Sequence, residues 1–268
     1  MSDTPRDIGE RRNRLRIIRR PLVTALPLAL LTAWTSLPLR AQMGKAAAVT
    51  LPAPGEQRFQ VFYGDMSRDV NVAEISYRLW HDTDRYEIGT RAKAIGMVAL
   101  FYSGNLIQSS VGRIGAEGLL PERYSERRGK RAERVVRFDY ERRKMIGTGN
   151  PPEVALPSGT QDRLSVFYQV GLMARAEPKR FEAGRRFTLP LASMKSIDMP
   201  IYSVVGPEAV TTARGAVSAL RLTVRNEADP EDPTIDVWLG TSISMLPARI
   251  RVEEHDGKVI DQVLLPSA

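Results

Sequence analysis

Short runs of alternating apolar and polar residues dominate the sequence from Gln57 to the C-terminus. The runs are rich in β-branched and aromatic residues and are broken by Gly, Asp and Asn, a pattern typical of strands joined by short turns. The strongest turn signal is Asp256-Gly257 in "RIRVEEHDGKVIDQVLL", since Asp-Gly between extended runs favours a hairpin. About ten runs without a strand–helix rhythm predict a mainly β protein, built on a curved antiparallel sheet or an open barrel.

One segment has a different period. The stretch "SGTQDRLSVFYQVGLMARAEP" begins with small residues suited to capping, Ser158 and Thr160, and stops before Pro178. Within it, apolar residues recur at helical spacing, namely Leu164, Phe167, Tyr168, Leu172 and Met173. We therefore expect one amphipathic helix packed on the sheet.

The stretch "GLLPERYSERRGK", residues 118–130, combines turn residues with charge. Gly118 and Pro121 favour a turn, because Gly tolerates a positive φ and Pro fixes φ near its turn value. In the residues that follow, Arg123, Ser125 and Arg127 alternate with Tyr124, Glu126 and Arg128, so that one face is heavily charged. We interpret the stretch as a turn that enters a strand with an exposed, charged rim.

The N-terminal segment has the layout of an export signal. Residues 1–41 contain eight Arg and three acids, and the nineteen residues from Pro21 to Leu39 carry no charge. A basic region followed by an apolar region is typical of a signal peptide. An uncleaved inner-membrane anchor is the alternative. In both cases we expect the segment to form a helix. Residues 42–56 are expected to be a linker, and residues 57–268 a β-rich domain in the periplasm or envelope.

The formal charge of +8 comes mostly from this segment, because the remaining chain has 31 basic and 28 acidic residues. A nucleic-acid-binding domain needs a basic face on the folded body, so we expect no nucleic-acid partner. The chain has no cysteine, which excludes disulfides, thiolate nucleophiles and cysteine-based metal sites.

No residue pattern indicates catalysis, a metal or a cofactor. His81 and His255 lie apart at expected strand ends, without a converging set of ligands or a nucleophile. A pair of carboxylates could act together in hydrolysis, but nothing in the sequence shows that any two of them face each other across a cleft. The acids considered are Glu122, Glu126, Asp139, Asp162, Asp198 and Asp236. We therefore assign no catalytic residue and expect no enzymatic activity.

Four stretches taken in order resemble domain-of-unknown-function family 3108. They are "GLLPERYSERR", "VRFDYERR", "PSGTQDRLSVFYQV" and "VWLGTSISMLPARIRVEEHDGKVIDQVL". The resemblance covers about residues 57–265. It implies an exported, mostly β protein of Gram-negative bacteria with no established activity and no known catalytic residues. The layout is also similar to that of periplasmic lipoprotein carriers, as an analogy of architecture only.

Two kinds of binding function follow as hypotheses. In the first, an apolar groove holds a lipid, an acyl chain or a lipidated protein, lined by Leu164, Phe167, Tyr168, Leu172, Met97, Leu100 and Phe101. In the second, the protein is an envelope assembly or structural factor that binds another protein through Arg127, Arg128 and Arg131. A hydrolase using Asp139 and Asp162 is the third and weakest hypothesis. If the N-terminal segment is uncleaved, it contacts the membrane.

Overall fold

The computed structural model describes residues 50–64, 70–95, 105–148, 153–213 and 215–265. The chain divides into two units, Met1–Met43 and Gly44–Ala268, and all of the described residues belong to the second. The expected signal or anchor, residues 1–41, lies outside the described residues. Met97, Leu100 and Phe101, three of the expected ligand-binding residues, also lie outside them.

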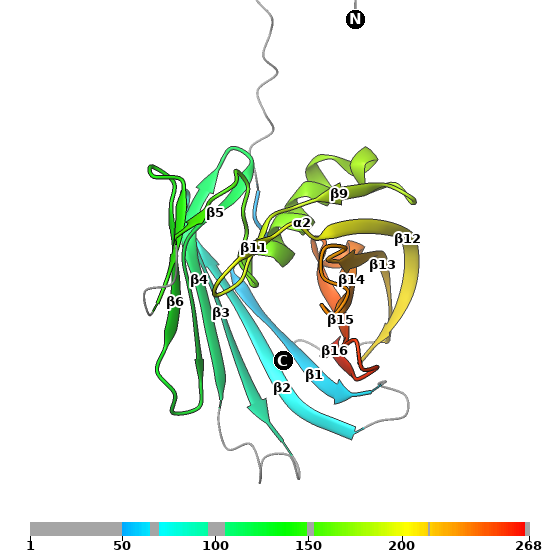
Figure 1. Cartoon of the computed structure of the whole chain (residues 1–268). Helices are drawn as coiled ribbons and strands as arrows, with labels where there is room; N and C mark the ends of the chain where they lie inside the picture. Colours follow the sequence, from blue (N-terminus) through cyan, green and yellow to red (C-terminus); the bar gives the residue numbers. More distant parts are fainter. Residues whose placement is uncertain (1–49, 65–69, 96–104, 149–152, 214, 266–268) are drawn as a thin grey trace, which may run out of the picture. The chain divides into compact units, whose positions relative to one another are not determined.

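Fourteen strands form one antiparallel sheet in the order β8-β7-β6-β5-β4-β3-β2-β1-β16-β15-β14-β13-β12-β9, and β10 and β11 pair separately (Figure 1). The strands are β1 (Gly55–Tyr63), β2 (Val70–His81), β3 (Arg85–Ala94), β4 (Leu106–Gly115), β5 (Gly118–Arg128), β6 (Arg134–Asp139), β7 (Lys144–Gly147), β8 (Val154–Ala155), β9 (Arg186–Thr188), β10 (Leu191–Ala192), β11 (Ile197–Asp198), β12 (Ile201–Thr212), β13 (Gly215–Arg225), β14 (Thr234–Gly240), β15 (Leu246–Glu253) and β16 (Val259–Leu264).

The mainly β prediction is confirmed, but the sheet has fourteen strands rather than about ten, and β8 and β9 are its two open edges. Part of the difference comes from β12, which contains Gly206 and Pro207. Pro cannot donate to a ladder, so it argues against a central strand. Pro207 fits here because β12 pairs with β9 only through Ile201–Ser203, which leaves its outer side unpaired beyond that point.

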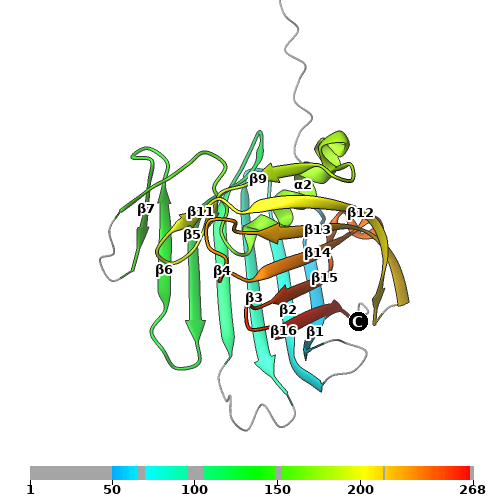
Figure 2. The same ribbon diagram turned by 45° about the vertical axis from the view of Figure 1, so that its right-hand side comes forward.

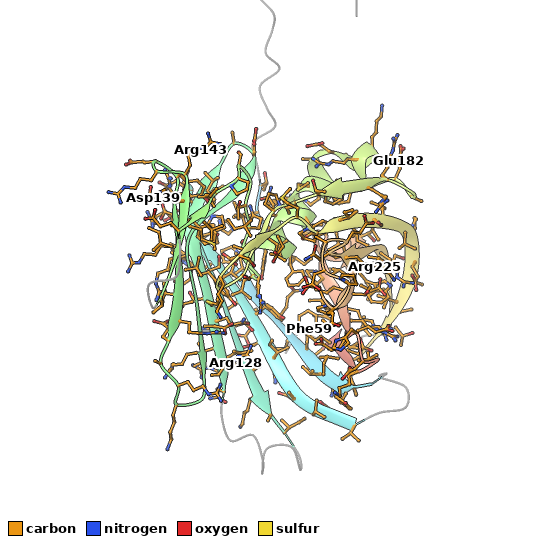
Figure 3. All side chains as sticks on the ribbon, viewed as in Figure 1. Phe59, Arg128, Asp139, Arg143, Glu182 and Arg225 are labelled. Atoms are coloured by element: carbon orange, nitrogen blue, oxygen red, sulfur yellow. The ribbon has the colours of Figure 1, made fainter. Side chains whose placement is uncertain are left out.

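The pairing of β16 with β1 divides the sheet into two parts. We name β1–β8 the N-terminal half-sheet, and β9 with β12–β16 the C-terminal half-sheet. Figure 2 shows the strands of the C-terminal half-sheet running across the direction of β1–β5. Phe59 of β1, labelled in Figure 3, is almost fully buried near the junction of the two parts.

Helix α2 (Ser165–Ala176) confirms the expected helix, and it ends before Pro178, which begins the short 3₁₀ helix η1 (Pro178–Phe181). Eight of its twelve residues are buried, because it carries two apolar stripes rather than one. Leu164, Tyr168 and Leu172 pack into the core of the N-terminal half-sheet. The stripe that the sequence analysis missed packs into the core of the C-terminal half-sheet; it consists of Val166, Val170 and Ala174.

The expected turn at Gly118 and Pro121 is wrong by a few residues. The turn lies at Ala116 and Glu117, and β5 runs continuously from Gly118 to Arg128. Pro121 fits within β5 because β6 pairs with that strand only between Arg123 and Glu126. Most of β5 is covered, so the exposed rim is reduced to its last two residues, Arg127 and Arg128. The Asp256-Gly257 hairpin is confirmed by the pairing of β15 with β16.

Candidate functional site

The Gln-Asp-x-x-Ser sequence at residues 161–165 fastens the start of α2 to the sheet. Asp162 is completely buried, and its Oδ1 accepts hydrogen bonds from the backbone N–H groups of Leu164 at 2.8 Å and Ser165 at 3.0 Å. Its Oδ2 accepts a hydrogen bond from Ser110 Oγ of β4 at 2.5 Å. Burial raises the pKa of Asp162 although these hydrogen bonds oppose the shift.

The expected role of Thr160 as a cap of the helix is wrong. Thr160 Oγ1 donates to the carbonyl of Pro157 at 2.7 Å, and the helix starts later, at Ser165. Both oxygens of Asp162 are occupied by structural hydrogen bonds, which argues against a role as nucleophile or base. Asp139, the other acid of the hydrolase hypothesis, accepts from the backbone N–H of Arg142 at 2.8 Å in its own turn.

Two glutamines attach the same region to the β4–β5 hairpin. Gln161 Nε2 donates to the carbonyl of Leu119 at 2.9 Å, while the N–H of Leu119 donates to Gln169 Oε1 at 2.8 Å. The approach is close at Gly118, where a Cβ atom would lie 2.1 Å from Gln169 Oε1 and where φ is +122°. A glycine is therefore required at this position.

A cavity of about 940 Å³ lies beside this junction, between the β4–β5 hairpin, α2 and the segment before it. Buried members of its lining are Leu119, Leu172, Leu189, Gln161 and Gln169. Exposed members include Ala116, Glu117, Arg175, Ala176 and Glu177. The cavity thus combines an apolar interior with charged groups at its mouth.

Gln161 supplies a polar group inside this cavity. The residue is almost fully buried, with 1% of its surface exposed. Its Nε2 is bonded, but its Oε1 has no hydrogen-bond partner among the residues that the structure describes. A buried acceptor of this kind is costly unless something donates to it.

The expected lipid-binding residues of α2 divide between this cavity and the core. Leu172 lines the cavity. Phe167 and Tyr168 line a separate space of only about 10 Å³, which is at the lower limit for one water molecule. Leu164 is 2% exposed and lies in the core. Of the expected helix residues Leu164, Phe167, Tyr168 and Leu172, the large cavity therefore contains Leu172 in its lining.

The model of the DUF3108 family, described as proteins of unknown function, matches residues 58–263. The chain belongs to this family. No curated protein sequence matches it.

Among solved structures, the DUF3108 chain is similar to a candidate lipoprotein from Parabacteroides distasonis, with 9% identity and a TM-score of 0.32. The match covers 81% of this chain and 95% of the other. A likeness at this level carries no argument about function.

The expected partner-binding arginines of this DUF3108 chain lie at the tip of the β5–β6 hairpin. Arg127, Arg128 and Arg131 are all exposed. Figure 3 shows Arg128 at the opposite end of this part of the sheet from Asp139 and Arg143. Arg128 and Arg131 also line a cavity of about 280 Å³.

The histidines have local roles in the DUF3108 fold. His81 Nε2 lies 2.9 Å from the carbonyl oxygen of Pro52, and His255 is exposed in the turn before β16. In the described part of the chain, no group of three His, Cys, Asp or Glu residues could hold a metal ion.

Within the same ranges, none of the helices combines the length and apolarity that crossing a membrane requires.

Most of the residues that line the cavity were not among the predicted ligand-binding residues. Leu119, Gln161, Gln169 and Leu189 were not proposed as ligand-binding residues. A signal for the two glutamines was present, because both lie within "PSGTQDRLSVFYQV", one of the stretches on which the family resemblance rests. Nothing in the spacing indicated that the β4–β5 hairpin would form the opposite wall.

Proposed function

We propose that the protein is a non-enzymatic binding protein of the bacterial envelope, and that the 940 Å³ cavity holds an amphiphilic ligand with an acyl or similar apolar chain. The observation that carries the proposal is the composition of the lining. Ligand sites are mostly apolar cavities of about 300–1,000 Å³ with a few convergent polar groups. The cavity between α2 and the β4–β5 hairpin has this size and this composition.

The interior favours the apolar part of such a ligand. Leu119, Leu172 and Leu189 are buried side chains that face the space from three different segments. Covering apolar surface stabilises a complex by roughly 25 cal/mol per Å². An alkyl chain gains from this contact whatever its detailed structure, which suits a carrier of lipids.

The mouth favours a polar head group. Arg175 is exposed at the end of α2 and has no ion-pair partner in the described residues. Gln161 Oε1 is a free acceptor within the same lining. A head group that combines an anionic oxygen with a hydroxyl or amide N–H meets both groups.

The location in the envelope is part of the proposal and is supported by the basic and apolar sequence of residues 1–41. Intact mass measured on the protein recovered from cells decides whether this segment is removed. Loss of about 41 residues supports export through a signal peptide, and a full-length membrane-bound chain supports the anchor.

Native mass spectrometry of the protein purified from the envelope fraction tests the cavity. We expect a stoichiometric amphiphile that is released by solvent extraction. Ala116→Trp and Ala176→Trp place a large ring at the mouth from two different elements, without altering the buried interior. Each variant should lower occupancy by roughly tenfold or more.

Ala228→Trp is the matched control, since Ala228 is exposed in the turn between β13 and β14, outside the cavity lining. It should retain the ligand. An empty wild-type protein would contradict the proposal. Full occupancy in both mouth variants, with an unchanged unfolding curve, would place any ligand elsewhere.

An envelope assembly factor is the second candidate, favoured by the exposed arginines at the β5–β6 hairpin tip. Arg127 is the most useful residue for this test, because it is exposed and does not line either cavity. If a protein partner binds here, Arg127→Glu should disrupt co-purification and leave lipid content unchanged. Unchanged co-purification would show that the tip of the β5–β6 hairpin is solvated surface and does not bind this partner.

A further inference from the structure

A second cavity, open to solvent, lies at the β5–β6 hairpin, on residues separate from the amphiphile site. Its volume is about 280 Å³, several times the roughly 30 Å³ that a water molecule occupies in the liquid. The lining residues are Glu126, Arg128, Arg131, Ala132 and Arg134. Three guanidinium groups thus face one carboxylate, which leaves the lining with two uncompensated positive charges.

Glu126 is the unusual member of this set. It lies on the strand face that also carries buried Tyr124, and its side chain is 1% exposed. Arg134 donates a hydrogen bond to Glu126 Oε1, and Arg128 Nε lies 3.6 Å from the same oxygen. Glu126 Oε2 is buried and has no hydrogen-bond partner in the described residues.

Glu126 remains ionised in this setting. Burial alone would raise its pKa, but the hydrogen bond and charge of Arg134, together with the charge of Arg128, hold the pKa below the ordinary value. A buried carboxylate oxygen without a donor is unfavourable. The oxygen therefore favours an occupant that donates a hydrogen bond.

The arginines impose the opposite requirement on the same occupant. Arg131 is exposed and makes no ion pair in the part of the chain that is described. Arg128 and Arg134 share a single carboxylate oxygen. Guanidinium groups bind carboxylate and phosphate oxygens well because their N–H groups match the spacing of two oxygens. The cavity therefore favours an anion that also carries a donor.

We propose that this cavity binds a phosphate group that carries its own hydroxyl donor. Arg128, Arg131 and Arg134 hold the anionic oxygens, and Glu126 Oε2 accepts a hydrogen bond from the hydroxyl. Sulfate has no proton at neutral pH, so it would leave Oε2 unpaired and opposite a like charge, which provides the selectivity. Hydrogen phosphate meets the requirement by itself, and a polyol phosphate meets it through a neighbouring hydroxyl.

Isothermal titration calorimetry on the purified protein tests the proposal with inorganic phosphate, glycerol 3-phosphate and sulfate. We expect inorganic phosphate to bind roughly tenfold or more tightly than sulfate at equal ionic strength. Tighter binding of glycerol 3-phosphate than of inorganic phosphate would assign the site to an organic phosphate. The reverse order would assign it to the free ion.

Glu126→Gln is the decisive variant. A glutamine side chain can donate as well as accept, so it satisfies sulfate, and we expect the preference for phosphate over sulfate to disappear. Arg131→Gln, at an exposed position of the hairpin, should weaken binding of both phosphate ligands by roughly tenfold. Arg137→Gln is the control, because Arg137 is exposed on β6 and does not line the cavity.

Equal affinities for phosphate and sulfate in the wild-type protein would overturn the proposal. So would a preserved preference in folded Glu126→Gln, or absence of binding at millimolar phosphate. Far-ultraviolet circular dichroism shows whether Glu126→Gln is folded. If it is not, Arg131→Gln against Arg137→Gln decides the matter, since neither replaces a buried side chain. Lipid content reports on the other cavity, so each site can fail independently.

Discussion

Both halves of the sheet pack against α2, but they contact it in different ways. The N-terminal half-sheet combines an apolar stripe with buried hydrogen bonds from β4 and β5 to Asp162 and Gln169. The C-terminal half-sheet contacts the helix through Val166, Val170 and Ala174. It also approaches the helix backbone at Gly171, where a Cβ atom would lie 2.6 Å from the carbonyl oxygen of Met245.

The difference separates two physical roles. Apolar contact stabilises without strong direction, because it depends mainly on the area removed from water. Buried hydrogen bonds are directional, and a group left without its partner costs about 1–3 kcal/mol. We infer that the N-terminal half-sheet sets the position of α2, and therefore the shape of the 940 Å³ cavity, while the C-terminal half-sheet covers the other side of the helix.

Removal of the Asp162 carboxylate should have the largest effect. Asp162→Ala leaves the backbone N–H groups of Leu164 and Ser165 without an acceptor and removes the hydrogen bond from Ser110 Oγ. We expect a loss of roughly 4 kcal/mol in the free energy of unfolding, measured in urea. Asp162→Asn, which keeps one carbonyl oxygen, should cost only about 1 kcal/mol. Equal losses in both variants would show that the charge matters more than the hydrogen bonds.

Matched truncations of the two stripes compare the apolar contacts. Leu164→Ala opens the core of the N-terminal half-sheet, and Val170→Ala opens that of the C-terminal half-sheet. We expect losses of about 3 and about 2 kcal/mol, because the leucine loses more buried carbon atoms. Urea unfolding curves with unchanged slopes would confirm that each loss reflects the native state. A larger loss for Val170→Ala would show that the core of the C-terminal half-sheet collapses less readily around the removed carbon atoms.

The close approach at Gly171 should have a smaller effect. Alanine is the better helix former by about 1 kcal/mol, but the new Cβ must displace the backbone carbonyl of Met245, which like Ser244 before it has a positive φ. We expect Gly171→Ala to destabilise the protein by roughly 1–2 kcal/mol in thermal or urea unfolding. A stabilising Gly171→Ala would show that β14 and β15 adjust freely.

The strand pattern, the helix and the final hairpin could be predicted from the sequence because each depends on local periodicity. The second stripe of α2 could not, since Val166, Val170 and Ala174 resemble ordinary helix residues until a second half-sheet covers them. The large cavity depends on pairing across distance, with Leu119 and Leu189 brought beside Leu172 only by tertiary structure. For the same reason Glu126 resembled one more exposed acid in a charged run, although it is buried.

The smallest expected effects concern pH, and they have opposite signs for the two buried carboxylates. Burial raises the pKa of Asp162, so the folded state keeps that proton to higher pH than the unfolded state. Its contribution to stability is complete below the ordinary carboxyl pKa and is lost as pH rises through the folded value. For Glu126 burial is outweighed by the hydrogen bond and charge of Arg134, which lower the pKa. Its contribution is present above the ordinary value and is lost as pH falls through the folded one.

Urea unfolding of wild type, Asp162→Asn and Glu126→Gln between about pH 3 and about pH 7 separates these contributions. Relative to Asp162→Asn, the wild-type protein should lose stability as pH rises from about 4. Relative to Glu126→Gln, it should gain stability at lower pH, as pH rises from about 3 to the ordinary glutamate pKa of about 4.3. Parallel curves for wild type and Asp162→Asn would mean that the hydrogen bonds of Asp162 cancel its burial. The carboxylate that positions the helix would then be ionised like the one in the arginine-lined cavity.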